Sequence, residues 1–126
     1  MASNASAKIL VVEDEEPVRT LICAMLSQNG YEILAAGDGE EALSLWRSHQ
    51  SRIAVVLTDV VMPRMSGPEL ARRIREVTPQ TSVIFMSGYS EEPVIDVAVG
   101  PDYAFLAKPF TAMDLHAVVR GAIEKS

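Results

Sequence analysis

Five short apolar runs, separated by segments of helical periodicity, constrain the fold of this chain more than any other feature. The runs are four or five residues long and rich in β-branched residues: Ile9–Val12, Ile33–Ala36, Ala54–Thr58, Val83–Met86 and Ala104–Ala107. Three of them show no alternation of polar and apolar residues. Such continuous runs are typical of parallel strands that are buried on both faces of a sheet.

The segments between the runs carry apolar residues at helical spacing, and four of them are clear: residues 18–26, 42–46, 70–77 and 115–123. A fifth, weaker helix is expected over Glu91–Val99, where Gly100 and Pro101 end it. Capping-box patterns mark three helix starts, at Asp38, Ser66 and Thr111. Five strands alternating with five helices predict a doubly wound α/β domain, with a five-stranded parallel sheet and helices on both faces.

Composition limits the domain organisation and the partners. The 126 residues are enough for one domain, and we expect a disordered tail over residues 1–7 and one domain over residues 8–126. A net charge of −6 argues against nucleic-acid binding. The longest apolar stretches, of about five residues, exclude a membrane-spanning helix, and the first residues lack the apolar core of a signal peptide. These features predict a cytoplasmic domain, and the single Cys23 excludes an internal disulfide.

Chemically complementary residues stand at the ends of four predicted strands. Glu13 and Asp14 follow the first strand directly, Asp59 ends the third, Ser87 ends the fourth and Lys108 ends the fifth. In an open parallel sheet, sites form beyond the carboxyl ends of the strands, where the winding direction reverses. We therefore expect three carboxylates, one hydroxyl and one ammonium group to meet at a single edge of the sheet.

The charges of this group indicate its chemistry. Three neighbouring carboxylates repel one another, and one lysine cannot offset them all. Mg²⁺ would do so, because it prefers oxygen ligands and few carboxylates. A metal there could bridge to a phosphoryl group, whose other oxygens Lys108 and Ser87 could bind. Asp59 is the favoured acceptor, since it stands apart from the acidic cluster and a carboxylate can attack phosphorus to give an aspartyl phosphate.

Four sequence blocks resemble the signature blocks of response-regulator receiver domains: Val11–Asp14, Leu57–Pro63, Met86–Gly88 and Phe105–Phe110. They occur in the order and spacing of that family, and the resemblance covers about residues 8 to 124. It implies a flavodoxin-like sheet with the strand order 2-1-3-4-5. The segment Ser87–Ser90 is most similar to receivers attached to hybrid histidine kinases.

The resemblance also implies an acceptor, a metal site and partners. Asp59 would be phosphorylated by a histidine kinase or a histidine phosphotransfer domain, and a downstream output domain or protein would respond. Asp14, Asp59 and the backbone carbonyl of Val61 would ligate Mg²⁺, while Glu13 would act mainly through water. The family's commonest residue at the position of Glu13 is aspartate, so this chain has a longer acidic arm of the same charge.

Three further residues take roles from the resemblance. Lys108 would contact the phosphoryl group, and the Lys108–Pro109 peptide would be cis. Ser87, where threonine is more frequent, would move to donate a hydrogen bond to the phosphoryl group. Phe105 matches the aromatic switch position. Such a domain is a phosphorylation switch and not an enzyme with a separate substrate.

Other functions of the same architecture fit the sequence less well. A phosphatase resembling the haloacid dehalogenase family needs an Asp-x-Asp pair after the first strand, where this chain has Glu13 and Asp14. A flavin or nucleotide module needs a phosphate-binding loop there, but the four acids of Glu13–Glu16 repel a bare phosphate. A receiver that serves only as a phosphate sink stays open. Four arginines are interpreted as solvated surface: Arg64, Arg72, Arg73 and Arg75.

Overall fold

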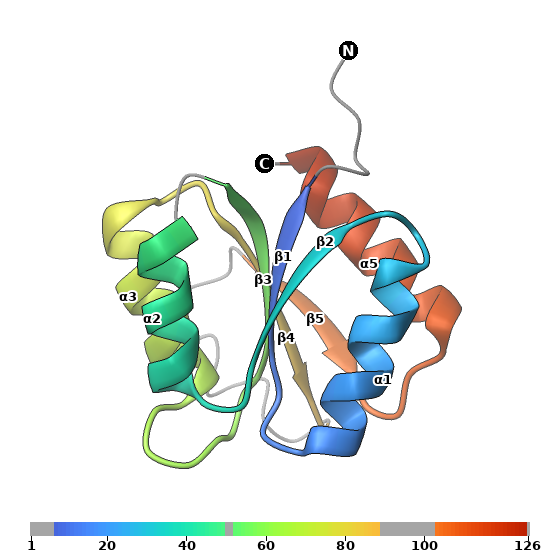
Figure 1. Cartoon of the computed structure of the whole chain (residues 1–126), viewed down its shortest axis with the longest axis horizontal. Coiled ribbons are helices and arrows are strands. Elements are labelled where there is room, and N and C mark those ends of the chain that lie inside the picture. Colours follow the sequence, from blue (N-terminus) through green and yellow to red (C-terminus); the bar gives the residue numbers. More distant parts are fainter. Residues whose placement is uncertain (1–6, 50–51, 89–102, 126) are drawn as a thin grey trace.

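A parallel five-stranded sheet forms the centre of the molecule (Figure 1). The computed structural model describes residues 7–49, 52–88 and 103–125. The strands are β1 Lys8–Val12, β2 Glu32–Ala36, β3 Ile53–Asp59, β4 Ser82–Ser87 and β5 Ala104–Ala107. They pair in parallel in the order β2-β1-β3-β4-β5. The expected strand number, direction and order are confirmed, and no strand extends its predicted run by more than one residue at either end.

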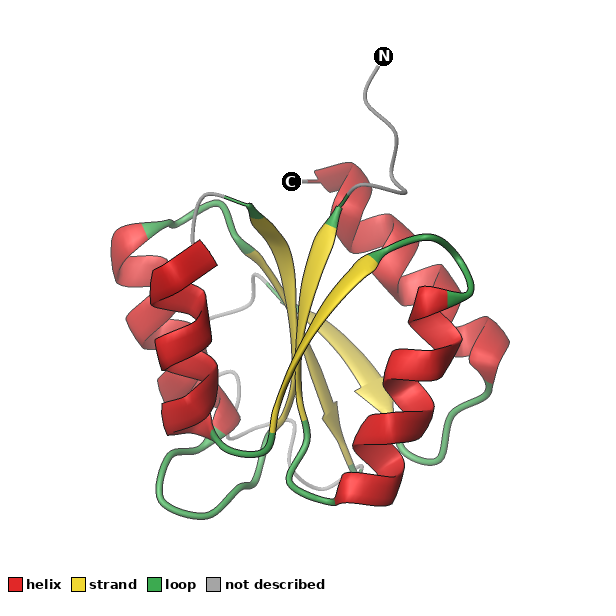
Figure 2. Cartoon of the chain, in the orientation of Figure 1, coloured by secondary structure: helices red, strands yellow, loops and turns green. Residues whose placement is uncertain are grey.

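Helices cover both faces of the sheet, as Figure 2 shows. The described part of the chain contains α1 Glu16–Ser27, α2 Gly39–His49, α3 Gly67–Val77 and α5 Ala112–Lys125. Helices α1 and α5 pack on one face, and α2 and α3 pack on the other. Four helices are thus seen where five were expected. The expected helix Glu91–Val99 lies outside the described residues, as do residues 1–6 of the expected tail.

Two apolar cores lie on the two faces, because successive residues of a strand point to opposite sides. In β1, Ile9 and Val11 join the core under α1 and α5, while Leu10 and Val12 join the core under α2 and α3. Every residue of β1 is buried, as the continuous apolar run predicts. Among the described residues, no helix combines the length and the apolar character that crossing a bilayer requires.

Side-chain caps fix three helix starts near the carboxyl ends of the strands that precede them. The Asp38 carboxylate accepts a hydrogen bond from the backbone N–H of Glu41 (2.8 Å) at the start of α2. The Ser66 hydroxyl accepts one from the backbone N–H three residues later (3.2 Å) at the start of α3. At α5 the capping box is reciprocal, since Thr111 and Asp114 exchange bonds of 3.0 and 3.1 Å. These caps hold the loops at one end of the sheet.

Candidate functional site

The polar residues expected at the strand ends lie at one end of the sheet. Glu13 and Asp14 follow β1 directly, and Asp59 is the last residue of the neighbouring strand β3. Ser87 ends β4, and Lys108 follows β5. The parallel direction of the strands places all five residues at the same edge, so the juxtaposition inferred from their positions in the sequence is present in the fold.

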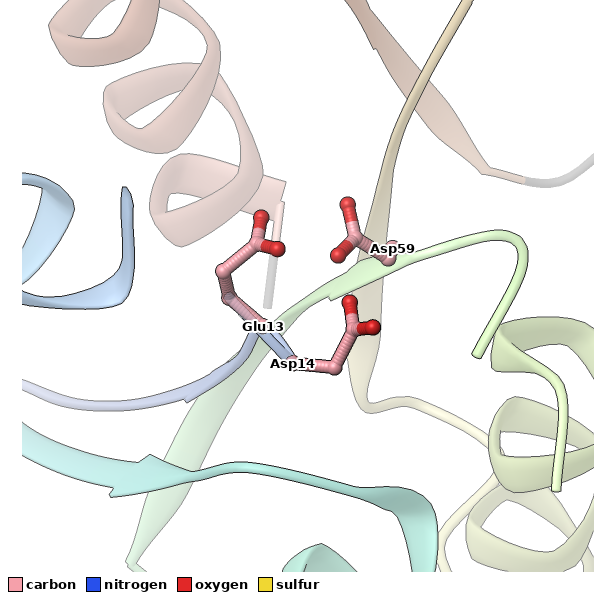
Figure 3. A group of neighbouring side chains, drawn as sticks. All are labelled: Glu13, Asp14 and Asp59. Atoms are coloured by element: carbon pink, nitrogen blue, oxygen red, sulfur yellow. The ribbon is translucent and has the colours of Figure 1, made fainter. Parts of the chain in front are cut away.

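Three carboxylates converge at the centre of this edge. One oxygen from each of Glu13, Asp14 and Asp59 lies within 4.8 Å of the other two. Figure 3 shows the three side chains turned toward a common space. Glu13 and Asp59 are buried, with 1% and 5% of their surface exposed, whereas Asp14 is exposed. The cluster therefore meets solvent on the side of Asp14.

Lys108 supplies positive charge to the buried half of the cluster. Its Nζ lies 2.7 Å from Asp59 Oδ1 and 2.9 Å from Glu13 Oε1. Its backbone N–H donates to the carbonyl of Ser87 (2.9 Å), which ties the end of β5 to the end of β4. The Lys108–Pro109 peptide is cis, as the resemblance implies. One ammonium group thus faces two carboxylates, and a third lies beside them.

The excess of carboxylates over ammonium groups affects the pKa values of the two buried carboxyl groups, Glu13 and Asp59. Burial, followed by the hydrogen bond with Glu13, raises the pKa of Asp59 to about 8, although Lys108 acts in the opposite direction. Burial would also raise the pKa of Glu13, but hydrogen bonds with Asp59 and Lys108 outweigh it and bring that pKa below its usual value. Without a metal, the two carboxyl groups therefore share one proton near neutral pH.

These residues fit a hard divalent cation. The cluster offers carboxylate oxygens, has three carboxylates against the single ammonium group of Lys108, and opens to solvent at Asp14, where a cation could keep bound water. Val61 lies two residues after Asp59, in the loop between β3 and α3, and 63% of its surface is exposed. A cation bound here would displace the proton that Glu13 and Asp59 share.

Gly67 brings the start of α3 against the end of β3. A Cβ atom at this position would lie 2.0 Å from the carbonyl oxygen of Asp59, which leaves no room for a side chain. The N–H of Gly67 also donates to the carbonyl of Val60 (2.8 Å). The sequence analysis missed this role. The available signal was a glycine between Ser66 and Pro68, where a helix former would otherwise be preferred.

Arg19 is a second residue that the sequence analysis missed. Its Nη1 reaches from α1 and donates to the backbone carbonyl of Glu13 (2.8 Å). This bond fixes the turn that carries Glu13 and Asp14. The spacing of apolar residues that predicts the helix gives no indication of this contact.

Ser87 and Phe105 lie near the carboxylates in different settings. The Ser87 side chain is buried, and its hydroxyl donates to the carbonyl of Gly88 (2.9 Å). The predicted bond to a phosphoryl group would require this hydroxyl to turn away from Gly88. Phe105 is half-buried and packs against the core under α2 and α3. Its role as a switch stays a prediction.

The strand order and the acidic edge define a class, namely flavodoxin-like α/β proteins with a carboxylate site at the point where the winding reverses. The amino-acid sequence identifies the family within this class. Residues 9–120 match the response regulator receiver domain, and the chain belongs to this family.

Relatives and solved structures agree with this assignment. The chain is 37% identical over 123 residues to the sensor kinase CckA of Brucella abortus, which covers 97% of this chain and 13% of that protein. It is 31% identical over 121 residues to the alkaline phosphatase synthesis transcriptional regulatory protein PhoP of Bacillus subtilis. This match covers 94% of this chain and 49% of PhoP. The crystal structure of the receiver domain from the hybrid histidine kinase CckA matches this fold with a TM-score of 0.78 at 33% identity. The match covers 93% of this chain and 99% of the crystallised chain. The chain therefore spans half or less of these two curated relatives.

Addition of Mg²⁺ is expected to stabilise the domain, because the metal binds the folded arrangement of carboxylates and not the unfolded chain. At ten times the dissociation constant, the gain is about 1.4 kcal/mol. Thermal unfolding with and without Mg²⁺, and after chelation, measures it. In the variant Asp14→Asn the gain should fall, since one ligand is lost. An equal gain in this variant would contradict a metal site at the cluster.

Proposed function

We propose that this domain accepts a phosphoryl group on Asp59 from a histidine kinase or a histidine phosphotransfer domain, in a reaction that depends on Mg²⁺. One observation carries the proposal. The buried carboxylate of Asp59 lies 2.7 Å from the ammonium group of Lys108 and within reach of Glu13 and Asp14 at the end of a central strand. A nucleophile, a cation for phosphoryl oxygens and a set of metal ligands thus come together in one place.

Each residue has a task in the proposed transfer. Asp14, Asp59 and the Val61 carbonyl would hold Mg²⁺, and Glu13 would act through water. When bound, the metal offsets the negative charge of the carboxylates and of the phosphoryl oxygens. An oxygen of Asp59 forms a bond to phosphorus, while the bond from phosphorus to the donor's imidazole nitrogen breaks and leaves its electron pair on that nitrogen. Lys108 then binds a phosphoryl oxygen.

The signal would arise from the response of Ser87 and Phe105. The new group adds a charge of about −1.5 to −2 and three acceptor oxygens. The Ser87 hydroxyl, now bonded to Gly88, would turn to donate to one of these oxygens. Phe105, on the neighbouring strand β5, would change its position in response. To change the ratio of active to inactive conformations from 1:99 to 99:1, phosphorylation must favour the active conformation by about 5.5 kcal/mol.

The proposed role is a switch that turns over no separate substrate. Its output would be a downstream domain or protein that recognises the phosphorylated form. The relatives include sensor kinases, such as the autoinducer 1 sensor kinase/phosphatase LuxN of Vibrio harveyi, which is 33% identical. Because a histidine kinase draws its phosphate from ATP, the exchange is proposed to take place in the cytoplasm.

Incubation with phosphoramidate tests the proposal directly. We expect the mass of the intact protein to rise by one phosphoryl group, only when Mg²⁺ is present. Reduction of the acyl phosphate with borohydride, followed by peptide mapping, should place the modification on Asp59. Modification of Asp14, His49 or His116 in its place, or labelling that does not depend on Mg²⁺, would contradict the proposal.

A further inference from the structure

The loop between β3 and α3 contains a residue in an unfavourable backbone conformation. Arg64 has a φ of 69°, and in the described ranges it is the one residue other than glycine with a positive φ. Residues with a Cβ rarely adopt this region, and glycine adopts it without penalty. Such a conformation persists when surrounding contacts hold it in place, and these cases cluster at functional sites.

The Arg64 side chain makes such a contact. Its Nη2 lies 3.0 Å from Oδ2 of Asp38, in the loop that precedes α2. The other oxygen of Asp38 accepts the backbone N–H of Glu41 and caps α2. This bond, together with the Arg64 charge, keeps the pKa of Asp38 below its usual value, so the carboxylate is ionised. Arg64 thus ties the β3–α3 loop to a carboxylate that α2 holds in a fixed position.

The Arg64–Asp38 pair is one of several anchors of this loop. Val60, Met62 and Met65 are buried in the core under α2 and α3, and the Thr58 hydroxyl donates to Met62 Sδ (3.9 Å). The N–H of Gly67 donates to the Val60 carbonyl (2.8 Å) at the two ends of the loop. Beside Arg64, Met65 packs against Gly39 at the start of α2, so closely that a Cβ on Gly39 would lie 2.8 Å from Met65 Cβ. Val61, whose carbonyl is proposed to ligate Mg²⁺, lies between these anchors in the chain.

We propose that Arg64 is a positioning residue for the phosphorylation site. Through its ion pair with Asp38, it holds the β3–α3 loop against α2 and so places the Val61 carbonyl for Mg²⁺. This inference rests on the proposed function, because it presumes the metal at Asp59. Neither Arg64 nor Asp38 touches the reacting atoms, and the pair acts through the loop.

Two substitutions separate the ion pair from the backbone strain. Arg64→Ala removes the ion pair and keeps the strain, whereas Arg64→Gly removes both. We expect both variants to bind Mg²⁺ about two- to five-fold more weakly, which is the scale of an exposed ion pair, and to accept phosphate from phosphoramidate more slowly. The thermal midpoint of Arg64→Gly should lie above that of Arg64→Ala. A role confined to stability would change the midpoint and leave Mg²⁺ affinity unchanged.

Asp38, which pairs with Arg64, and a second exposed arginine, Arg72, provide two controls. Asp38→Asn should weaken Mg²⁺ binding as Arg64→Ala does, and the double variant should show no further loss. Arg72→Ala removes another exposed arginine, which pairs with Glu69 and Glu76 on α3, and this variant should bind Mg²⁺ as the wild type does. The ratio of the Mg²⁺ dissociation constants of Arg64→Ala and the wild type should approach one at high salt, because salt screens exposed charges.

The outcomes distinguish this inference from the function on which it rests. If the wild type binds Mg²⁺ and is phosphorylated, but the Arg64 variants have wild-type Mg²⁺ affinity, the positioning role is wrong and the proposed function stands. If the wild type itself neither binds Mg²⁺ nor accepts phosphate, both are wrong.

Discussion

Replacement of Asp59 by asparagine is expected to abolish phosphorylation by small donors and to stabilise the metal-free domain. Asparagine has nearly the same shape, but its amide is no nucleophile toward phosphorus, so labelling by phosphoramidate should be lost completely. Lys108 keeps Glu13 as a partner at 2.9 Å. We expect a gain of about 1–2 kcal/mol near neutral pH, because folding of the variant no longer has to protonate a buried carboxylate that is ionised in the unfolded chain.

The gain in stability should depend on pH. The pKa of Asp59 is about 8 in the folded domain, against a usual value of 3.8. Between these values the folded state binds more protons than the unfolded state, so this group makes the domain less stable as the pH rises from about 4 to about 8. The variant lacks this contribution. Urea unfolding of both proteins without metal should therefore give stabilities that diverge as the pH rises through this window.

Glu13→Gln is the matched control for this experiment. It also removes one buried carboxylate beside Lys108, but it leaves the acceptor in place. We expect this variant to accept phosphate at a reduced rate, while Asp59→Asn accepts none. Labelling of Asp59→Asn at the wild-type level, or a metal-free domain that the substitution destabilises, would overturn our account of the site.

Replacement of Gly67 by alanine should have the largest structural effect of a single added methyl group. The new Cβ would lie 2.0 Å from the Asp59 carbonyl oxygen, a separation that requires the start of α3 or the end of β3 to move. We expect a loss of about 2–4 kcal/mol in the free energy of unfolding, at the upper end of the cost of overpacking. Mg²⁺ affinity should fall about tenfold or more, because the moved segment carries Asp59 and Val61.

Gly121→Ala provides the control for Gly67→Ala. Gly121 lies in α5, and a Cβ there would meet no atom within 4 Å. Alanine is the better helix former, so this variant should gain about 0.5–1 kcal/mol and bind Mg²⁺ normally. Chemical unfolding and Mg²⁺ titration measure both effects. Wild-type stability and Mg²⁺ affinity in Gly67→Ala would show that the contact with Asp59 does not constrain the site.

The sequence was sufficient to predict the sheet and the convergence of Glu13, Asp14, Asp59 and Lys108. Continuous apolar runs specify strands buried on both faces, and parallel strands bring their carboxyl ends to one edge. Position along the chain then decides which residues meet. The same reasoning placed Ser87 at this edge, but it could not predict that its hydroxyl would bond to Gly88, because rotamers depend on the local packing.

The contacts that depend on loops could not be predicted. Periodicity does not determine the path of the β3–α3 loop, so neither the positive φ of Arg64 nor the close approach of Gly67 to Asp59 followed from it. The interpretation of four arginines as solvated surface is correct for Arg72 and Arg73, which form exposed ion pairs on α3. It is incomplete for Arg64, which pairs with the cap of α2, and for Arg75, which is half-buried and donates to the Thr81 carbonyl (3.3 Å).

The unequal exposure of the three carboxylates has a consequence for the lifetime of the signal. Glu13 and Asp59 are buried, and Asp14 marks the side on which the cluster meets solvent. A phosphodonor, a hydrolysing water molecule and a phosphatase would all arrive from that side. A protein that remains docked over Asp14 after delivering its phosphate would therefore also shield the acyl phosphate from hydrolysis. In the proposed function, the duration of the phosphorylated state would then depend on the residence time of the partner.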